Sequence, residues 1–176
     1  MNETLKTILN RRSTRKYKAE NINDEELNLI LEAAKFAPTG MNRQPWHFTA
    51  VQNKELLEKI NEGAKEAIGK ADNKAFSVFY NAPTLIIASG DLAVPTSKED
   101  CVLALENMFL AAESLNIGSC WIYSIQVFLN SPKGESVRKE LGIPSGFSVF
   151  GTGAFGYKAA EASPAPRKEN TVTIIK

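Results

Sequence analysis

The chain has 176 residues, of which 43% are hydrophobic and 23% are charged, a composition typical of a folded globular protein. Its 21 basic and 20 acidic side chains give a net charge of +1, so no global field favours nucleic acid or an anionic membrane. The opening residues 1–6 carry no apolar signal-peptide core and no apolar stretch reaches a bilayer span. We therefore expect a cytoplasmic protein, without a membrane segment, that forms one domain over residues 1–176.

Cysteine and histidine are too scarce for the common metal sites. Cys101 and Cys120 are too far apart for a CxxC pattern, and His47 is the only histidine. We expect two reduced thiols and no metal site. A Cys–His nucleophile pair is the alternative to a structural role for His47, but no third partner is evident.

Periodic apolar residues and turn signals predict alternating helices and strands. The predicted helices are a short one before Arg11, one capped by Asn23 that ends before Pro38, and others over residues 54–70, 72–80, 96–115 and 135–141. The predicted strands cover residues 47–51, 85–88, 119–123, 147–150 and 171–175. This mixture indicates a three-layer α/β or α+β domain, with residues 85–88 as a buried central strand.

The segment 101–115 is apolar around its whole circumference, and such a helix must be buried on every side. One interpretation is a deep helix covered by neighbours from the same chain. We favour the other, a helix at the centre of a homodimer interface, because the sheet of so short a chain can cover only one side.

A dense set of hydrogen-bond donors occupies residues 11–16, Arg-Arg-Ser-Thr-Arg-Lys. Guanidinium forks bind phosphate through paired charge-assisted bonds, and hydroxyls fill the remaining acceptor positions. The alternatives are a solvated basic turn and a nucleic-acid-binding arm. A nucleic-acid arm has no wider basic footprint to support it, so we expect no nucleic-acid partner.

Residues 37–46, Ala-Pro-Thr-Gly-Met-Asn-Arg-Gln-Pro-Trp, predict a rigid loop between two prolines. Its glycine lets the backbone approach a ligand closely. Asn42 and Gln44 each offer a donor and an acceptor, as a planar heterocycle with C=O and N–H groups requires. Gln44 precedes Pro45, so we expect it to be extended. The alternative is a plain connection in which Trp46 fills the core.

The third cluster, Pro-Ala-Pro-Arg-Lys at residues 164–168, would by itself indicate a surface tail. Together and in this order, however, the three clusters resemble the flavin-dependent nitroreductase family. Its members open with Arg-Arg-Ser-x-Arg, continue with Pro-Ser-x-x-Asn-x-Gln-Pro-Trp and finish with Pro-x-Pro-Arg-Lys. The resemblance covers essentially the whole chain.

That resemblance implies an α+β fold, a three-layer sandwich whose central, mainly antiparallel sheet is flanked by helices. It implies an intertwined homodimer with C-terminal strand exchange, in which each site is shared between subunits. It also implies non-covalent FMN. The residues implied at the phosphate are Arg11, Arg12, Ser13, Arg15 and Arg167, and those along the ribityl chain and ring are Pro38, Thr39, Gly40, Asn42 and Gln44.

Tyr123 and Ser124 match the family segment whose backbone N–H faces the hydride-accepting nitrogen of the flavin.

Two positions depart from the family pattern. Thr39 replaces a common Ser and keeps the hydroxyl, whereas Ala165 stands where many members carry Lys. Whether Lys168 compensates for Ala165 at the phosphate is left open by the motif.

The implied activity is ping-pong transfer of electrons from NADH or NADPH to a small oxidised acceptor such as a nitroaromatic or a quinone. The cofactor carries the chemistry, so we assign no catalytic acid or nucleophile. The alternatives are a flavin-dependent dehalogenase or dehydrogenase and a non-enzymatic FMN-binding protein. The motifs specify neither the physiological acceptor, nor the preferred nicotinamide, nor the sensitivity to oxygen.

Residues 151–156 match the dinucleotide-binding pattern GxGxxG. Too little chain follows them for the second strand of a βαβ unit. We therefore expect a glycine-rich strand end at this position rather than a phosphate-binding turn.

Overall fold

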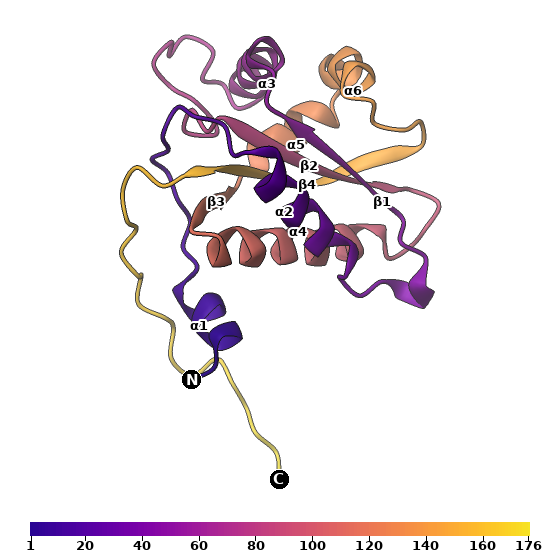
Figure 1. The fold of residues 1–176 in the computed structure, drawn as a ribbon. Helices are drawn as coiled ribbons and strands as arrows, with labels where there is room; N and C mark the ends of the chain where they lie inside the picture. The colour runs from indigo at the N-terminus through magenta and orange to yellow at the C-terminus, as the bar shows by residue number, and fades with distance from the viewer.

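In the computed structural model, which describes residues 1–176, four antiparallel strands form one sheet in the order β1-β2-β4-β3 (Figure 1). The strands are β1 (Trp46–Val51), β2 (Thr84–Asp91), β3 (Ile117–Trp121) and β4 (Phe147–Tyr157). The α-helices are α1 (Glu3–Asn10), α2 (Asp24–Lys35), α3 (Lys54–Ala67), α4 (Ser97–Ser114), α5 (Tyr123–Leu129) and α6 (Glu135–Glu140). Short 3₁₀ turns cover Gly40–Asn42 and Pro132–Gly134.

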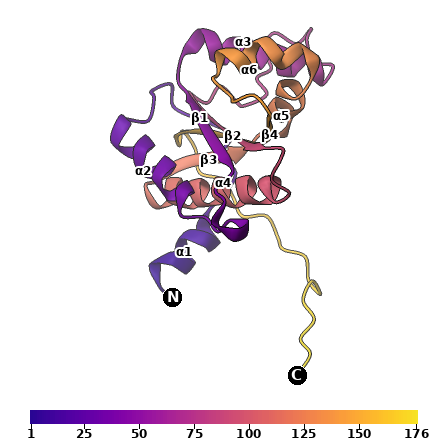
Figure 2. The same cartoon turned by 90° about the vertical axis from the view of Figure 1, so that its right-hand side faces the viewer.

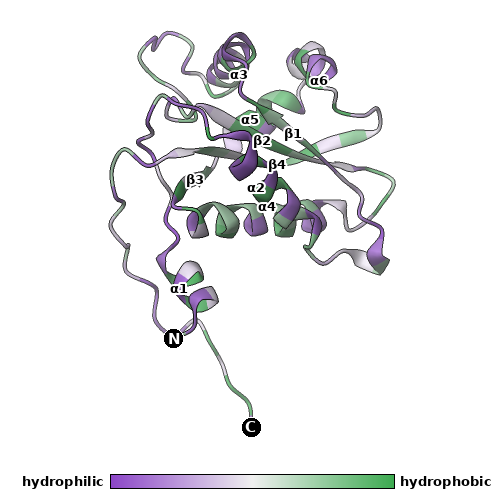
Figure 3. Ribbon diagram, in the orientation of Figure 1, coloured by the Kyte–Doolittle hydropathy of each residue, from purple (hydrophilic) through white to green (hydrophobic).

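Helices cover both faces of the sheet, as the two perpendicular views show (Figures 1 and 2). On one face α2 and α4 enclose a core of 12 buried residues, among them Ile30, Leu105 and Phe155. On the other face α3, α5 and α6 enclose a core of 19 buried residues, among them Ile60 and Ile125. Hydrophobic residues lie along the central strands and along α4 (Figure 3). The predicted three-layer α+β fold is confirmed.

The glycine-rich segment 151–156 is part of the central strand β4. A Cβ atom at Gly153 would lie 2.8 Å from the ring of Phe109 on α4, closer than packed carbon atoms approach. The glycines therefore let α4 pack closely on the sheet, and the expected strand explains the GxGxxG match. The strand is much longer than the predicted 147–150 because these glycines continue the pairing with β2 and β3.

The apolar helix α4 is covered largely by its own chain. Met108 and Phe109 are 0% and 4% exposed, and Phe109 packs against the rings of Trp121 and Phe155. In the single chain one side of α4 is open, since Leu103 is 45% exposed, and burial on every side in a homodimer stays a prediction. Any interface formed by α4 must therefore use the side that carries Leu103.

Two predicted elements are absent. Residues 72–80 form turns rather than a helix, because Val78 and Phe79 enter the core beside α3 while Asn61 Oδ1 accepts the Val78 N–H. Residues 171–175 form no strand, since no strand of the same chain pairs with them. Helix α5 was not predicted, and it takes Tyr123 out of the expected strand.

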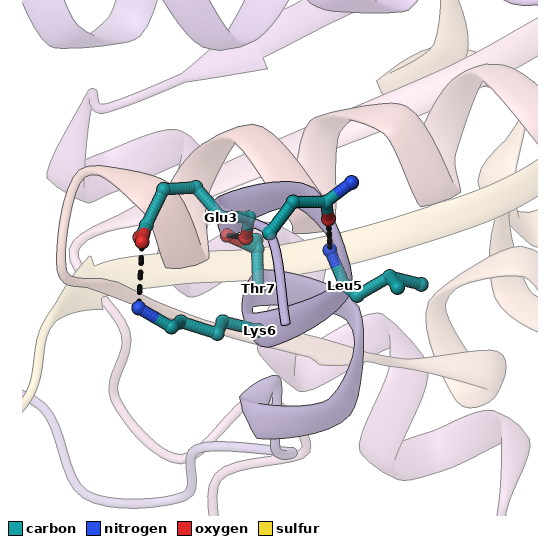
Figure 4. Close-up of polar contacts among 5 residues, drawn as sticks. Glu3, Leu5, Lys6 and Thr7 are labelled. Atoms are coloured by element: carbon teal, nitrogen blue, oxygen red, sulfur yellow. Dashed lines mark hydrogen bonds and ion pairs between the residues drawn. The ribbon is translucent and has the colours of Figure 1, made fainter.

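The polar contacts at the N-terminal end of helix α1 are local (Figure 4). Asn2 Oδ1 accepts the Leu5 N–H at 2.9 Å, and the Lys6 ammonium lies 2.6 Å from Glu3 Oε1. Its apolar side chains, Leu5, Ile8 and Leu9, are about half exposed. None of the helices combines the length and the apolar character needed to span a bilayer.

Candidate functional site

The segment 11–15 runs beside the outer edge of strand β3. Ser13 forms a parallel bridge with Ser119, and the Thr14 N–H donates to the Ser119 carbonyl at 2.9 Å. Thr14 is buried, and it lies directly over Gly118, where a Cβ atom would come within 2.6 Å of the Thr14 side chain. Because side chains alternate along an extended segment, Arg11, Ser13 and Arg15 share one side.

Cys120 lies on strand β3 beside this segment, and Arg11, Ser13 and Arg15 all influence its pKa. Burial raises the pKa of Cys120, while the nearby charge of Arg15, the Ser13 side chain and the charge of Arg11 oppose that rise. The structure therefore brings together three of the four N-terminal residues that the sequence predicts at the phosphate. This side of the segment is locally electropositive in a chain whose net charge is only +1.

Arg12 turns to the opposite side. Its Nη1 donates to the carbonyl oxygens of Leu9 and Arg11 at 2.7 and 2.8 Å. It lines a separate polar cavity that includes Glu113 and Lys158. Arg12 thus caps the C-terminal end of α1, where free carbonyls attract a cation, and its role at the phosphate stays a prediction.

The two remaining guanidiniums are held differently. Arg11 Nε lies 3.7 Å from Glu106 Oε1 on α4, a long, half-exposed ion pair. Arg15 Nε donates to the Tyr80 hydroxyl at 3.3 Å, and its guanidinium carbon lies 5.8 Å from the centre of the Tyr80 ring. This hydrogen bond is the largest of the effects that raise the pKa of Arg15.

The loop 38–45 is fixed to the first turn of α4. Asp100, which is 4% exposed, accepts the Gly40 N–H at 3.3 Å and the Thr96 hydroxyl at 2.9 Å. A Cβ atom at residue 40 would lie 2.7 Å from Thr96 Oγ1, so this close approach requires glycine. Thr39 contributes its hydroxyl oxygen, which accepts the Gln44 N–H at 3.3 Å.

The amides of Asn42 and Gln44 lie together at the exposed tip of this loop. Gln44 Nε2 donates to Asn42 Oδ1 at 3.0 Å, which leaves the Asn42 amide N–H₂ group and Gln44 Oε1 available to a ligand. The expected extended conformation of Gln44 is wrong, since its φ is 47°. The turn imposed by the hydrogen bond to Thr39 outweighs the bias from Pro45. Pro38 precedes this turn and is exposed.

Tyr123 and Ser124 begin helix α5 immediately after β3. Tyr123 is 64% exposed, and as first-turn residues both have backbone N–H groups without an intrahelical acceptor. The preceding residue, Ile122, is tied to β4, because its N–H donates to the Thr152 carbonyl at 2.8 Å. A fixed strand therefore presents free N–H groups at this point.

The structure does not bring Arg167 close to Arg11, Ser13 and Arg15. It lies on the exposed segment 160–176, which leaves the folded part of the chain beside α1 (Figure 1). Lys168 lies on the same segment. Their predicted roles at the phosphate stay predictions.

Sequence reasoning missed Tyr80, Asp100 and Cys120 as neighbours of the predicted site residues. Each contacts a motif residue that is distant along the chain, and none belongs to a short motif of its own. The only available signal was the acidic pair Glu99–Asp100 in the first turn of a helix, which also has an ordinary explanation in the helix dipole.

Comparisons with known proteins agree with this geometry. The model of the nitroreductase family matches residues 8–157. A protein of Archaeoglobus fulgidus, named an NADH dehydrogenase/NAD(P)H nitroreductase, is 37% identical over 161 residues, which cover 92% of this chain and 88% of that one.

Two solved structures are also similar over all of both chains. A nitroreductase from Bacteroides fragilis with bound FMN is 41% identical, with a TM-score of 0.91. A nitroreductase from Desulfitobacterium hafniense with bound FMN is 32% identical, with a TM-score of 0.90. The family match, the sequence identity and the shared fold show that the chain belongs to the nitroreductase family.

Proposed function

We propose that this chain is an FMN-dependent oxidoreductase that passes electrons from NADH or NADPH to a small oxidised acceptor such as a nitroaromatic or a quinone. The observation that carries the proposal is the placement of Arg11, Ser13 and Arg15 on one side of an extended segment held by β3. FMN-bound relatives with the same fold support it. Residues 1–176 are proposed to form a single FMN-binding domain of a cytoplasmic protein.

The donors present fit the phosphate of FMN. Two guanidiniums and a hydroxyl are the donor types that give a phosphate monoester charge-assisted and neutral hydrogen bonds. Arg15 has no carboxylate partner within ion-pair distance, and that of Arg11 is 3.7 Å away and half exposed. The cluster therefore carries positive charge that the chain does not neutralise, and a bound dianion would neutralise it.

The amides of Asn42 and Gln44 fit the polar edge of the isoalloxazine ring, since together they still offer donors and an acceptor. Asp100 and Thr96 hold the loop that presents them. Tyr123 and Ser124 are proposed to present backbone N–H groups to the ring at the start of α5.

Bound FMN supplies the hydride and electron transfer. The protein residues bind and orient it, and we assign none of them a proton-transfer role. Burial raises the pKa of Cys120 and of Tyr17, two titratable groups near Arg15, so both stay protonated near neutral pH. Solvent is the proposed source of protons, since the amide-bearing loop is exposed.

The chain is proposed to act as a homodimer with exchanged C-terminal segments. The outer edge of β3 is partly covered by residues 13–14, whereas β1 pairs only with β2. Beside that free edge lies a groove of about 670 Å³ between α2 and β1. Its lining combines three hydrophobic residues, Leu29, Leu31 and Phe48, with the polar residues Glu25, Asn28, Glu32 and Lys35.

The occupant proposed for the groove is the segment 171–175 of a second copy. Its sequence, Thr-Val-Thr-Ile-Ile, alternates as an edge strand does, and Val172, Ile174 and Ile175 are at least 75% exposed in the isolated chain. Adding this strand to β1 would satisfy the free backbone groups of that edge. The exposed side chains of α1 and Leu103 would complete the interface.

The visible spectrum of the purified protein tests the cofactor. We expect bound flavin that is released on denaturation, and steady-state oxidation of NADH or NADPH only when a nitroaromatic or quinone acceptor is added. A flavin-containing protein that oxidises neither nicotinamide would instead be an FMN-binding protein without this activity. Apoprotein that takes up no FMN would overturn the proposal. Light scattering, with a variant ending at residue 170, tests the exchanged dimer.

A further inference from the structure

The 3₁₀ turn Gly40–Asn42 takes its N-terminal cap from a distant helix. Helices α1, α2 and α3 each begin after an asparagine whose own side chain accepts an N–H of the first turn. Thr39 precedes the 3₁₀ turn but makes no such bond; its hydroxyl oxygen accepts the Gln44 N–H instead. Asp100, 60 positions beyond Gly40 in the chain, accepts the Gly40 N–H at 3.3 Å. The cap of this turn is therefore supplied by α4.

The loop that contains this turn has an unusual backbone. Met41, Asn42 and Gln44 have φ values of 55°, 55° and 47°, in the left-handed region that residues other than glycine rarely adopt. Such a backbone persists only where its surroundings impose it. A backbone hydrogen bond from the end of β2 holds the C-terminal end of the loop. The bond to Asp100 is the one hydrogen bond between the loop and the rest of the chain that a side chain makes, so a substitution can remove it.

Asp100 is a fixed point from which to hold the loop. It lies in the 18-residue helix α4, is 4% exposed and also accepts the Thr96 hydroxyl at 2.9 Å. A carboxylate buried to this degree is costly unless its oxygens are hydrogen-bonded, so both oxygens retain their donors. The amides of Asn42 and Gln44, in contrast, are exposed and hydrogen-bond only to each other. Their orientation therefore depends on the turn that Asp100 caps.

We propose that Asp100 is a positioning residue, which holds the amides of Asn42 and Gln44 in the orientation that receives the isoalloxazine ring of FMN. This inference rests on the proposed function. Holding the amides before the ligand arrives lowers the ordering cost of binding. Three properties distinguish this role from a purely structural one: it acts on the ring and not on the phosphate, it acts only through the two amides, and it requires a hydrogen-bond acceptor at residue 100 rather than a negative charge.

The test measures the dissociation constants of FMN and riboflavin with the apoprotein and the reduction potential of bound FMN. We expect Asp100→Ala to weaken both flavins by the same factor, about three- to tenfold, and to shift the potential, because hydrogen bonds to the ring tune it. In a chain that already carries Asn42→Ala and Gln44→Ala, Asp100→Ala should have no further effect.

Two further variants separate geometry from charge. Asp100→Asn keeps an oxygen that accepts the Gly40 N–H, and its amide can donate to Thr96 Oγ1, so it should bind both flavins as the wild type does. Glu99→Ala is the matched control, since it removes an exposed carboxylate from the same first turn of α4, and it should change neither affinity nor potential. If Asp100→Ala does not fold, Thr96→Val removes only the hydroxyl bond to the carboxylate and should give a smaller loss for both flavins.

The outcomes separate this inference from the proposed function. Wild-type apoprotein that binds no FMN overturns both. If the variant without both amides keeps the affinity and potential of the wild type, the ring assignment of Asn42 and Gln44 is wrong and so is the role of Asp100. If the amides matter but Asp100→Ala, or Thr96→Val in its place, changes neither quantity, or acts equally without the amides, the proposed function stands and the positioning role is overturned. Asp100→Asn that behaves as Asp100→Ala does also overturns it, since the charge would then be what matters.

Discussion

Replacement of Gly118 by alanine should displace the phosphate-binding segment without touching any of its donors. The new methyl group would lie 2.6 Å from Thr14 Cγ2 and Oγ1 and 2.8 Å from Thr14 Cβ. Thr14 cannot move away easily, because it is 3% exposed and its N–H is bonded to the carbonyl of Ser119 at 2.9 Å. Relief of the clash must therefore push the segment off β3 and carry Ser13 and Arg15 with it.

Overpacking of this kind costs about 1–3 kcal/mol, which corresponds to a fall of roughly 2–12 °C in Tm for a chain of this size. A displaced donor set should also weaken FMN, so the stabilisation that saturating FMN gives should fall as well. Thermal unfolding with and without FMN, together with titration of the apoprotein, measures both effects.

The control is Thr14→Gly, alone and combined with Gly118→Ala. The double variant removes the contacting atoms, so its FMN affinity should return toward that of Thr14→Gly. Gly118→Ala apoprotein with unchanged Tm and FMN affinity would refute the packing of residues 13–15 against β3 as the basis of the site.

Arg12→Ala should lower the free energy of unfolding by about 0.5–1.5 kcal/mol, because the hydrogen bonds to two carbonyl groups are lost. It should weaken FMN binding less than Arg15→Ala does. If FMN titrations show the larger loss of affinity for Arg12→Ala, Arg12 has the phosphate role predicted from sequence. Asn42→Ala and Gln44→Ala should each change the affinity or reduction potential of FMN while apoprotein stability stays within about 1 kcal/mol; normal flavin behaviour beside a falling Tm would contradict this. Burial raises the pKa of Cys101 from 9.0 to about 12, so the unfolded thiol ionises first and stability should fall as pH rises from 9 toward 12. Urea unfolding at each pH should show a shallower alkaline fall in Cys101→Ala, and equal slopes would contradict the assignment.

The elements that the sequence predicted are those whose signals are local. The Asn23 cap is confirmed, since its Oδ1 accepts the Glu26 N–H at 2.9 Å, and the apolar run of β2 is the buried central strand. The failures have a different cause. Residues 72–80 have helical spacing but serve as an anchored turn, because their apolar side chains fill a core built by α3 and α5. The left-handed backbone of Gln44 likewise depends on a hydrogen bond from the turn that encloses it.

In the candidate site, too, residues with local signals were predicted and residues that depend on the tertiary fold were not. The family resemblance implied a phosphate role for Arg11, Arg12, Ser13 and Arg15 alike. It could not separate Arg12 from the other three, because the distinction depends on which side of the segment faces β3. Tyr80 and Asp100 were beyond prediction, since each meets its partner only through the tertiary fold.

Helix α4 carries the attachment points of both segments that are proposed to bind the ligand. The amide-bearing loop is attached at Asp100 in its first turn, and the phosphate segment is attached through Arg11 at Glu106. These positions are six residues apart, about 9 Å along the axis. A two-fold dimer that crosses at α4 duplicates both attachments, so the loop of one copy can face the donors of the other. The exposed side of α4 at Leu103 lies between the two attachment points in sequence. We therefore expect FMN affinity and dimer formation to depend on the same surface, and a stable monomer that binds FMN as tightly as the dimer would contradict the shared site.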